Sequence, residues 1–142
     1  MPDKDYAHRD VTDKLSIRAG DAVRVVGQGE RQLLARVRQK TGRRLIDSDT
    51  LLDVVLYWPK NIEEITPTLF ELRGAIRPAG GIGVITAKRD RTSASGMAYV
   101  SQDALIPFGR AAGLVDNKIC SISDDESAIR FVIRRKDRTN QR

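Results

Sequence analysis

The sequence Asp53-Val-Val-Leu-Tyr-Trp58, near the middle of the 142-residue chain, is its strongest candidate for a β-strand. β-Branched and aromatic residues favour strands, and a run this short is too brief for an ordinary helix. Its apolar residues are continuous rather than alternating, so both faces of the strand are expected to be buried. Such strands occur in parallel sheets that helices cover on each side. The stretch therefore predicts the central strand of a layered α/β domain.

Strand and helix patterns alternate on both sides of this stretch. Before it, the pattern predicts a strand over 21–26, a turn over 27–29, a helix over 30–41 and a weak second strand over 44–46. After it come helical residues 62–76 with a break at Pro67, a strand over 82–86, a polar loop over 88–99, a helix over 101–112, and strands over 117–122 and 128–134. The turn-forming residues 123–127 join the last two strands. The order predicts a three-layer, Rossmann-like α/β fold whose mostly parallel sheet ends in a C-terminal antiparallel hairpin.

Length and composition predict one domain that needs no disulfide. We expect a flexible segment over 1–14, the domain over 15–135 and a basic tail over 136–142. The single cysteine, Cys120, lies in an apolar strand pattern and is expected to be a buried structural thiol. A lone cysteine and an N-terminus without an apolar core predict a cytoplasmic protein. With one histidine, His8, neither a zinc site nor a catalytic triad is expected.

The chain carries a formal net charge of +6. The last nine residues, 134–142, hold five Arg or Lys against one Asp, so much of the excess lies in the tail. A solvated tail explains this charge, and a polyanionic partner is the alternative. Nucleic acid would bind to the basic helix face and the tail. Three Tyr, three Phe and one Trp offer little aromatic surface on which the bases of a single strand could stack. The basic face consists of Arg31, Arg36, Arg38, Lys40, Arg43 and Arg44.

Several of these motifs resemble class I S-adenosylmethionine methyltransferases. They are the glycine-containing turn after the first strand, the acid after the second, DVVLYWP at the fourth-strand position, and IRPAGGIGVI leading into the fifth. More closely, the chain resembles a short bacterial domain-of-unknown-function family with the same DVVL strand and GLVD-K-C…RFVIRRK ending, over about residues 6–138. The resemblance implies a Rossmann-like fold and no established activity. The helix–strand–helix unit that helps wall the adenine pocket in the larger enzymes is absent here, which puts binding of S-adenosylmethionine in doubt.

Candidate ligand-binding residues follow the predicted strands. Open α/β sheets bind ligands beyond the carboxyl ends of their strands. The residues expected there are Gly27, Gln28, Gly29, Asp47, Trp58, Pro59, Lys60 and Lys88. No catalytic residue and no metal ligand is assigned.

The glycine turn argues against a dinucleotide. The dinucleotide fingerprint needs a third glycine at position 32, which is Gln32, and a carboxylate at Glu30 would repel a pyrophosphate from the helix N-terminus. Asp47 lies 20 residues after Gly27, a distance that suits an acid binding ribose hydroxyls. Asp47 also suits an ordinary turn.

The remaining candidates each have a structural and a functional interpretation. Trp58 either stacks on an aromatic ligand or covers the core. Together with Pro59 it loosely resembles an aromatic–proline motif of methyltransferases. Lys60 and Lys88 either hold an anion together or are solvated. His8 would act as a general base only if the N-terminal stretch folds over the crevice.

Three functions compete. The first is a non-catalytic module that binds a small ligand or a partner, including a homodimer through the sheet edge. It is favoured because no nucleophile–base pair is evident in the sequence. The alternatives are a methyltransferase, which needs positioning more than a catalytic triad, and a nucleic-acid-binding protein.

Overall fold

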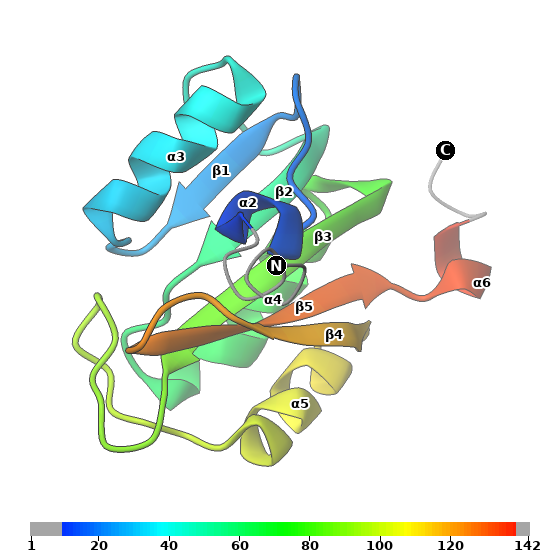
Figure 1. The fold of residues 1–142 in the computed structure, drawn as a ribbon. Coiled ribbons are helices and arrows are strands. Elements are labelled where there is room, and N and C mark those ends of the chain that lie inside the picture. Colours follow the sequence, from blue (N-terminus) through cyan, green and yellow to red (C-terminus); the bar gives the residue numbers. More distant parts are fainter. Residues whose placement is uncertain (1–9, 139–142) are drawn as a thin grey trace, which may run out of the picture.

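Five strands form one mixed sheet in the computed structural model, which describes residues 10–138. They are β1 Val23–Val26, β2 Leu52–Tyr57, β3 Ile76–Ala87, β4 Leu114–Ser121 and β5 Glu126–Ile133. Their order across the sheet is β1-β2-β3-β5-β4. The first three are parallel, while β5 is antiparallel to both of its neighbours (Figure 1). The C-terminal hairpin therefore extends the parallel part of the sheet, as the sequence predicts.

The strand β2 lies between β1 and β3, in the parallel part of the sheet. Successive side chains of a strand point to opposite faces. Val54, Leu56 and Trp58 accordingly belong to the core on one face of the sheet. Val55 and Tyr57 belong to the core on the other face. The expected burial of this strand on both faces is confirmed, although the middle strand of the five is β3 and β2 lies second, beside the edge strand β1.

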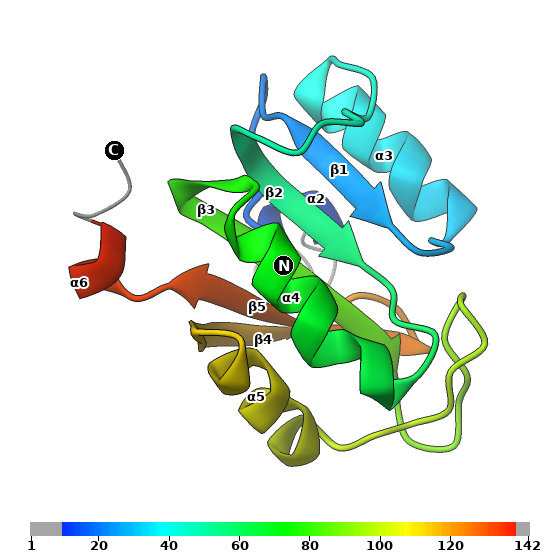
Figure 2. The same cartoon turned by 180° about the vertical axis from the view of Figure 1, so that it is seen from behind.

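Helices cover both faces of the sheet (Figures 1 and 2). On one face lie α2 Val11–Lys14 and α3 Arg31–Thr41. On the other lie η1 Ile62–Glu64, α4 Ile65–Arg73 and α5 Gln102–Ala111, and the short α6 Arg135–Arg138 follows β5. The three-layer, Rossmann-like α/β class is therefore confirmed. Over the described residues, every helix is too short or too polar to cross a bilayer.

Local sequence signals explain where the longer helices begin and end. The Glu30 carboxylate accepts hydrogen bonds from the first backbone N–H groups of α3, and Gly42 ends that helix in the left-handed conformation at φ 71°. Ser101 caps α5 through a hydrogen bond from the N–H of Ala104. These ends agree with the predicted ones to within a residue or two.

Two predicted strands differ from the structure. Residues 44–46 form no strand. The N–H of Ile46 donates to the carbonyl of Val23 in β1, and the Arg24 side chain of β1 then bonds to the Ser48 carbonyl and to Asp49. The strand β3 starts at Ile76, six residues earlier than predicted, and passes through Pro78. Pro78 is tolerated because the β2–β3 register shifts there, so its missing N–H costs no ladder hydrogen bond.

The packed part of the chain starts earlier than the sequence predicts. Within the expected flexible segment 1–14, residues 11–14 form α2, and Val11 and Thr12 are buried. Leu15 and Ile17 continue this packing against the sheet. The apolar residues are spaced too irregularly in a short polar stretch to signal a helix on their own. The other proposed domain limits stay predictions.

Candidate functional site

The ends of β1 and β2 bring the glycine turn and Trp58 into contact. The N–H of Trp58 donates to the carbonyl oxygen of Val26 at 2.9 Å. Gly27 follows at φ 89°, and a Cβ placed on it would lie 2.2 Å from the Trp58 carbonyl oxygen. A side chain at position 27 is therefore excluded both by backbone conformation and by space. Glycine is required at position 27 because the end of β2 lies so close to it.

The second glycine makes room for the indole ring. A Cβ on Gly29 would lie 2.8 Å from Cζ3 of Trp58, closer than such atoms pack. The Trp58 side chain is 0% exposed and packs among the residues between α3 and the sheet. The indole thus fills the space under the turn where the sequence suggests that a ligand would lie. This placement agrees with the interpretation of Trp58 as a cover over the core.

Glu126, at the start of β5, anchors the indole. Its carboxylate accepts a hydrogen bond from Trp58 Nε1 at 3.0 Å and another from the N–H of Ala94 at 2.8 Å, both on the same oxygen. Glu126 is 3% exposed. Burial raises the pKa of this carboxyl above its usual value, and the two hydrogen bonds oppose that rise. Glu126 was not among the residues singled out, because its role depends on contacts with residues far away in the sequence.

The loop over residues 88–100 packs over Trp58 and Pro59 at the end of β2. Ser95 Oγ donates to the carbonyl oxygen of Pro59 at 2.6 Å, and Ala94 is tied to Glu126. Pro59 is buried, as are Ser93 and Met97 of the loop. The loop therefore holds Trp58 and Pro59 in place from the outside, and its polar sequence gave no sign of this packing.

The Glu30 carboxylate occupies the position at the N-terminus of α3 where an anion would bind. The Glu30 carboxylate accepts from the N–H of Gln32 at 2.9 Å and from that of Leu33 at 3.0 Å. The hollow left beside it measures about 160 Å³ and is lined by both Glu30 and Glu126. Small-molecule sites typically measure roughly 300–1,000 Å³. The remaining space is small, and Arg36 lines it together with the two carboxyl groups.

The other predicted site residues do not join this cluster. Gln28 and Lys60 are exposed. Lys88 Nζ donates to Ser121 Oγ at 2.6 Å. Asp47 is exposed and follows Ile46, which contacts the start of β1, so it lies at the opposite end of β1 from Gly27. The expected place for Asp47 is wrong because the second strand that would carry it does not form.

The remaining reactive groups show no catalytic arrangement. Cys120 is half-buried, its thiol lies 3.6 Å from the Lys14 carbonyl oxygen, and burial raises its pKa. His8 lies outside the described residues. The part of the chain that is described holds no group of His, Cys, Asp and Glu suited to a metal ion.

A larger cavity lies at the opposite, amino end of the parallel strands, where the sequence predicts no site. It measures about 340 Å³ and is lined mainly by charged side chains. These are Arg18, Asp21, Asp53, Arg77 and Arg130, with Ser16, Val54, Ala79 and Gly80. One signal was present in the sequence: Arg130 interrupts the otherwise apolar strand Ala128–Ile133.

Solved structures with a similar fold are methyltransferases. An S-adenosylmethionine-dependent methyltransferase from Aquifex aeolicus is 14% identical, with a TM-score of 0.66 over 85% of this chain and 86% of that one. CalO1, a methyltransferase in calicheamicin biosynthesis solved with S-adenosylhomocysteine bound, is 16% identical, with a TM-score of 0.63 over 94% and 55%. A TehB-like enzyme from Corynebacterium glutamicum is 11% identical, with a TM-score of 0.55 over 94% of each chain. Identities this low show a shared fold and no more.

Sequence comparison identifies the family. No curated protein matches the chain. The family described as "Protein of unknown function (DUF3052)" matches residues 12–135, which include every strand of the sheet and the helices between them. The expected relation to a domain-of-unknown-function family with a methyltransferase-like fold is thereby confirmed, and the chain belongs to the DUF3052 family.

Proposed function

We propose that this chain is a non-catalytic binding module, in which a tryptophan occupies the crevice that open α/β sheets use for ligands. The observation that carries the proposal is the burial of Trp58 under Gly29, with its indole N–H bonded to Glu126. A cofactor entering there would have to displace a fully buried aromatic side chain. It would also have to break the hydrogen bonds that satisfy a buried carboxylate, which is costly.

The chemistry around the crevice supports the same proposal. Glu126, the buried carboxyl there, is bonded to an indole N–H and a backbone N–H, and neither group is a nucleophile. Tyr57, at the end of β2, donates its hydroxyl proton to Glu64, and burial raises its pKa further from neutrality. In neither arrangement does a base lie beside a nucleophile that it could activate.

Titration calorimetry with S-adenosylmethionine and S-adenosylhomocysteine tests the proposal. We expect no saturable heat at millimolar ligand, and no change in the fluorescence of Trp58, the one tryptophan of the chain. Saturable binding with one ligand per chain, accompanied by a change in that fluorescence, would overturn the proposal and favour a methyltransferase. The methyltransferase alternative rests on the shared fold.

The nucleic-acid alternative is weakened by contacts within the chain. Arg36 pairs with Asp10, Lys40 pairs with Asp13 at 2.9 Å, and Arg43 donates to the Gly20 carbonyl. Three of the six residues of the expected basic face therefore bond to residues between 10 and 20. If DNA is nevertheless bound through phosphates, its affinity must fall as salt rises.

The proposed binding partner includes a second copy of this chain, which would pair through an edge of the sheet. The edge strand β4 leaves one side unpaired, but its register shifts between Asp116 and Lys118, and Lys118 is exposed. Bulges and lysines on edge strands discourage pairing with another chain. Sedimentation analysis separates a monomer from a dimer. A cytoplasmic location is likewise a proposal, supported by the lone half-buried cysteine.

A further inference from the structure

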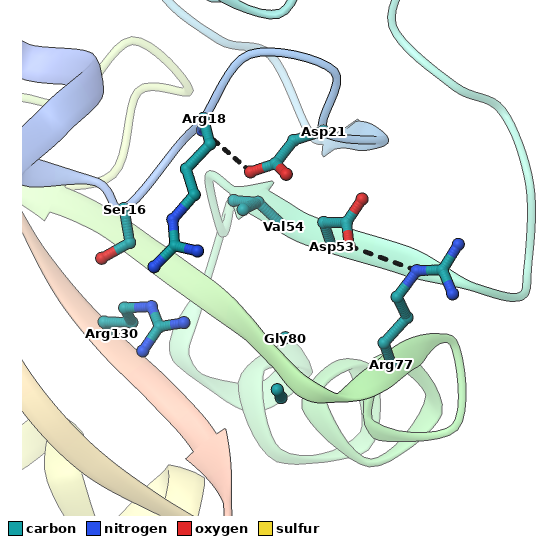
Figure 3. Close-up of a pocket in the computed structure, with 9 residues that line it drawn as sticks. Ser16, Arg18, Asp21, Asp53, Val54, Arg77, Gly80 and Arg130 are labelled. Carbon is teal, nitrogen blue, oxygen red and sulfur yellow. Dashed lines mark hydrogen bonds and ion pairs between the residues drawn. The ribbon is translucent and has the colours of Figure 1, made fainter.

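The cavity at the amino end of the sheet has a rim built by two ordered aspartates (Figure 3). Asp53, at the start of β2, accepts a hydrogen bond from the N–H of Ala22 at 2.8 Å and pairs with Arg77 at 3.2 Å. Asp21 accepts from the backbone N–H of Arg18 at 2.9 Å. Both carboxylates are thus used in positioning the segments around the cavity, and only Arg77 among its arginines is paired with one of them.

Arg130 reaches the cavity from β5, across the face of β3. Its guanidinium lies over Gly81: a Cβ at that position would be 2.6 Å from Nε and 2.7 Å from the terminal nitrogen Nη2. The absence of a side chain at position 81 therefore provides the space in which the guanidinium lies. Nε of Arg130 is buried and has no acceptor among residues 10–138. A buried donor without an acceptor is uncommon and calls for an explanation.

The charges in the cavity are not balanced. Burial lowers the pKa of Arg130, and the charges of Arg138 and Arg18 lower it further. Within the described residues, no carboxylate pairs with the guanidinium of Arg18 or of Arg130. Figure 3 shows the Arg18 side chain directed toward Arg130 over the cavity. The three arginines Arg18, Arg77 and Arg130 outnumber the two carboxylates around the cavity, and this excess of positive charge favours the binding of an anion.

We propose that this cavity binds the phosphate group of a small ligand, held by Arg18 and Arg130. Planar guanidinium groups match the oxygen geometry of phosphate and bond to it in a bidentate way. The volume of about 340 Å³ suits a small metabolite. Carboxylate oxygens of Asp21 and Asp53 on the rim would accept hydrogen bonds from hydroxyl groups of the ligand. The proposal concerns the opposite end of the sheet from Trp58, so it holds whether or not the other crevice binds a cofactor.

Titration calorimetry and thermal unfolding with inorganic phosphate test the site, with chloride at matched ionic strength as the reference. We expect one phosphate to bind per chain and to raise the unfolding temperature, because a ligand that binds only the folded state stabilises it. Phosphate monoesters of small polyols form the second arm. Tighter binding of a monoester supports a site for a phosphorylated small molecule, whereas equal binding overturns that part of the proposal.

Two variants separate a built site from a general effect of positive charge. Arg130→Gln removes the guanidinium, and Gly81→Ala keeps the charge but takes the space in which the guanidinium lies. Each is expected to weaken phosphate binding about tenfold or more. Arg38→Gln makes the same charge change on an exposed part of α3 and should leave binding within about twofold.

Three outcomes would overturn the proposal. They are the absence of phosphate binding to the unmodified protein at millimolar concentration, equal stabilisation by chloride, and equal losses in Arg38→Gln and Arg130→Gln. The unfolding temperature of each variant without phosphate shows that it is folded. Because S-adenosylmethionine binding is measured separately at Trp58, failure at one site is not mistaken for failure at the other.

Discussion

The two ends of the sheet differ in how their polar groups are satisfied. At the carboxyl end, Trp58 fills the crevice and its N–H is bonded to a buried carboxylate, which also accepts from Ala94. At the amino end, a cavity remains and the buried Nε of Arg130 has no acceptor among the described residues. The methyltransferase-like fold indicates where a ligand is usually bound, but the contacts at that position decide whether any space is left.

The largest expected effect comes from emptying the filled crevice. Trp58→Ala should reduce the free energy of unfolding by about 3–5 kcal/mol, because it leaves a cavity and deprives Glu126 of a donor. Denaturant unfolding followed by circular dichroism measures the loss. Trp58→Phe keeps an aromatic ring and should lose less. A loss below about 1 kcal/mol for the alanine variant would contradict the assigned packing.

A smaller effect is expected at the glycine turn. Gly29→Ala places a Cβ 2.8 Å from the indole, and such overpacking costs about 1–3 kcal/mol. Gly74→Ala is the matched control, since its φ is −76° and its new Cβ would meet only a backbone oxygen at 3.6 Å. It should be neutral or slightly stabilising. If both variants unfold alike, Gly29 is not there to accommodate the tryptophan.

Removing the buried polar group at the amino end of the sheet should not reduce the free energy of unfolding. Arg130→Met keeps much of the aliphatic side chain and removes a charge that has no partner among residues 10–138. We expect stability within about 1 kcal/mol of the unmodified protein, or above it, when no phosphate is present. A loss as large as that of Trp58→Ala would show that Arg130 has a structural role and not a binding one.

The smallest effect is a pH dependence at the filled crevice. The pKa of Glu126 is raised by burial, so the folded state holds its proton to a higher pH than the unfolded chain does. Glu126 therefore contributes full stability below its unfolded pKa and loses it as pH rises through the folded pKa. Glu126→Gln should lack this decrease. Unfolding free energies of both proteins across mildly acidic pH give the difference, and parallel profiles would contradict the shift.

The candidate site was less predictable than the fold because it depends on long-range contacts. Gly27, Trp58 and Pro59 were correctly placed near the ends of neighbouring strands, since parallel strands end at the same edge. The acceptor for the Trp58 indole lies 68 residues away at Glu126, and the loop that covers Pro59 has a polar sequence. Arg130 contacts Gly81 because β5 pairs with β3. No local sequence pattern predicts these contacts.

The class of the fold can be derived from the sequence, because strand and helix periodicities and helix-end residues are local properties of the chain. The continuous apolar run at 54–58 was enough to predict a strand buried between two helical layers. Which end of the sheet is open depends instead on contacts between distant parts of the chain. A side chain as large as Trp58 fills a crevice or lines it according to its rotamer and its partners, and those depend on segments that folding alone brings together.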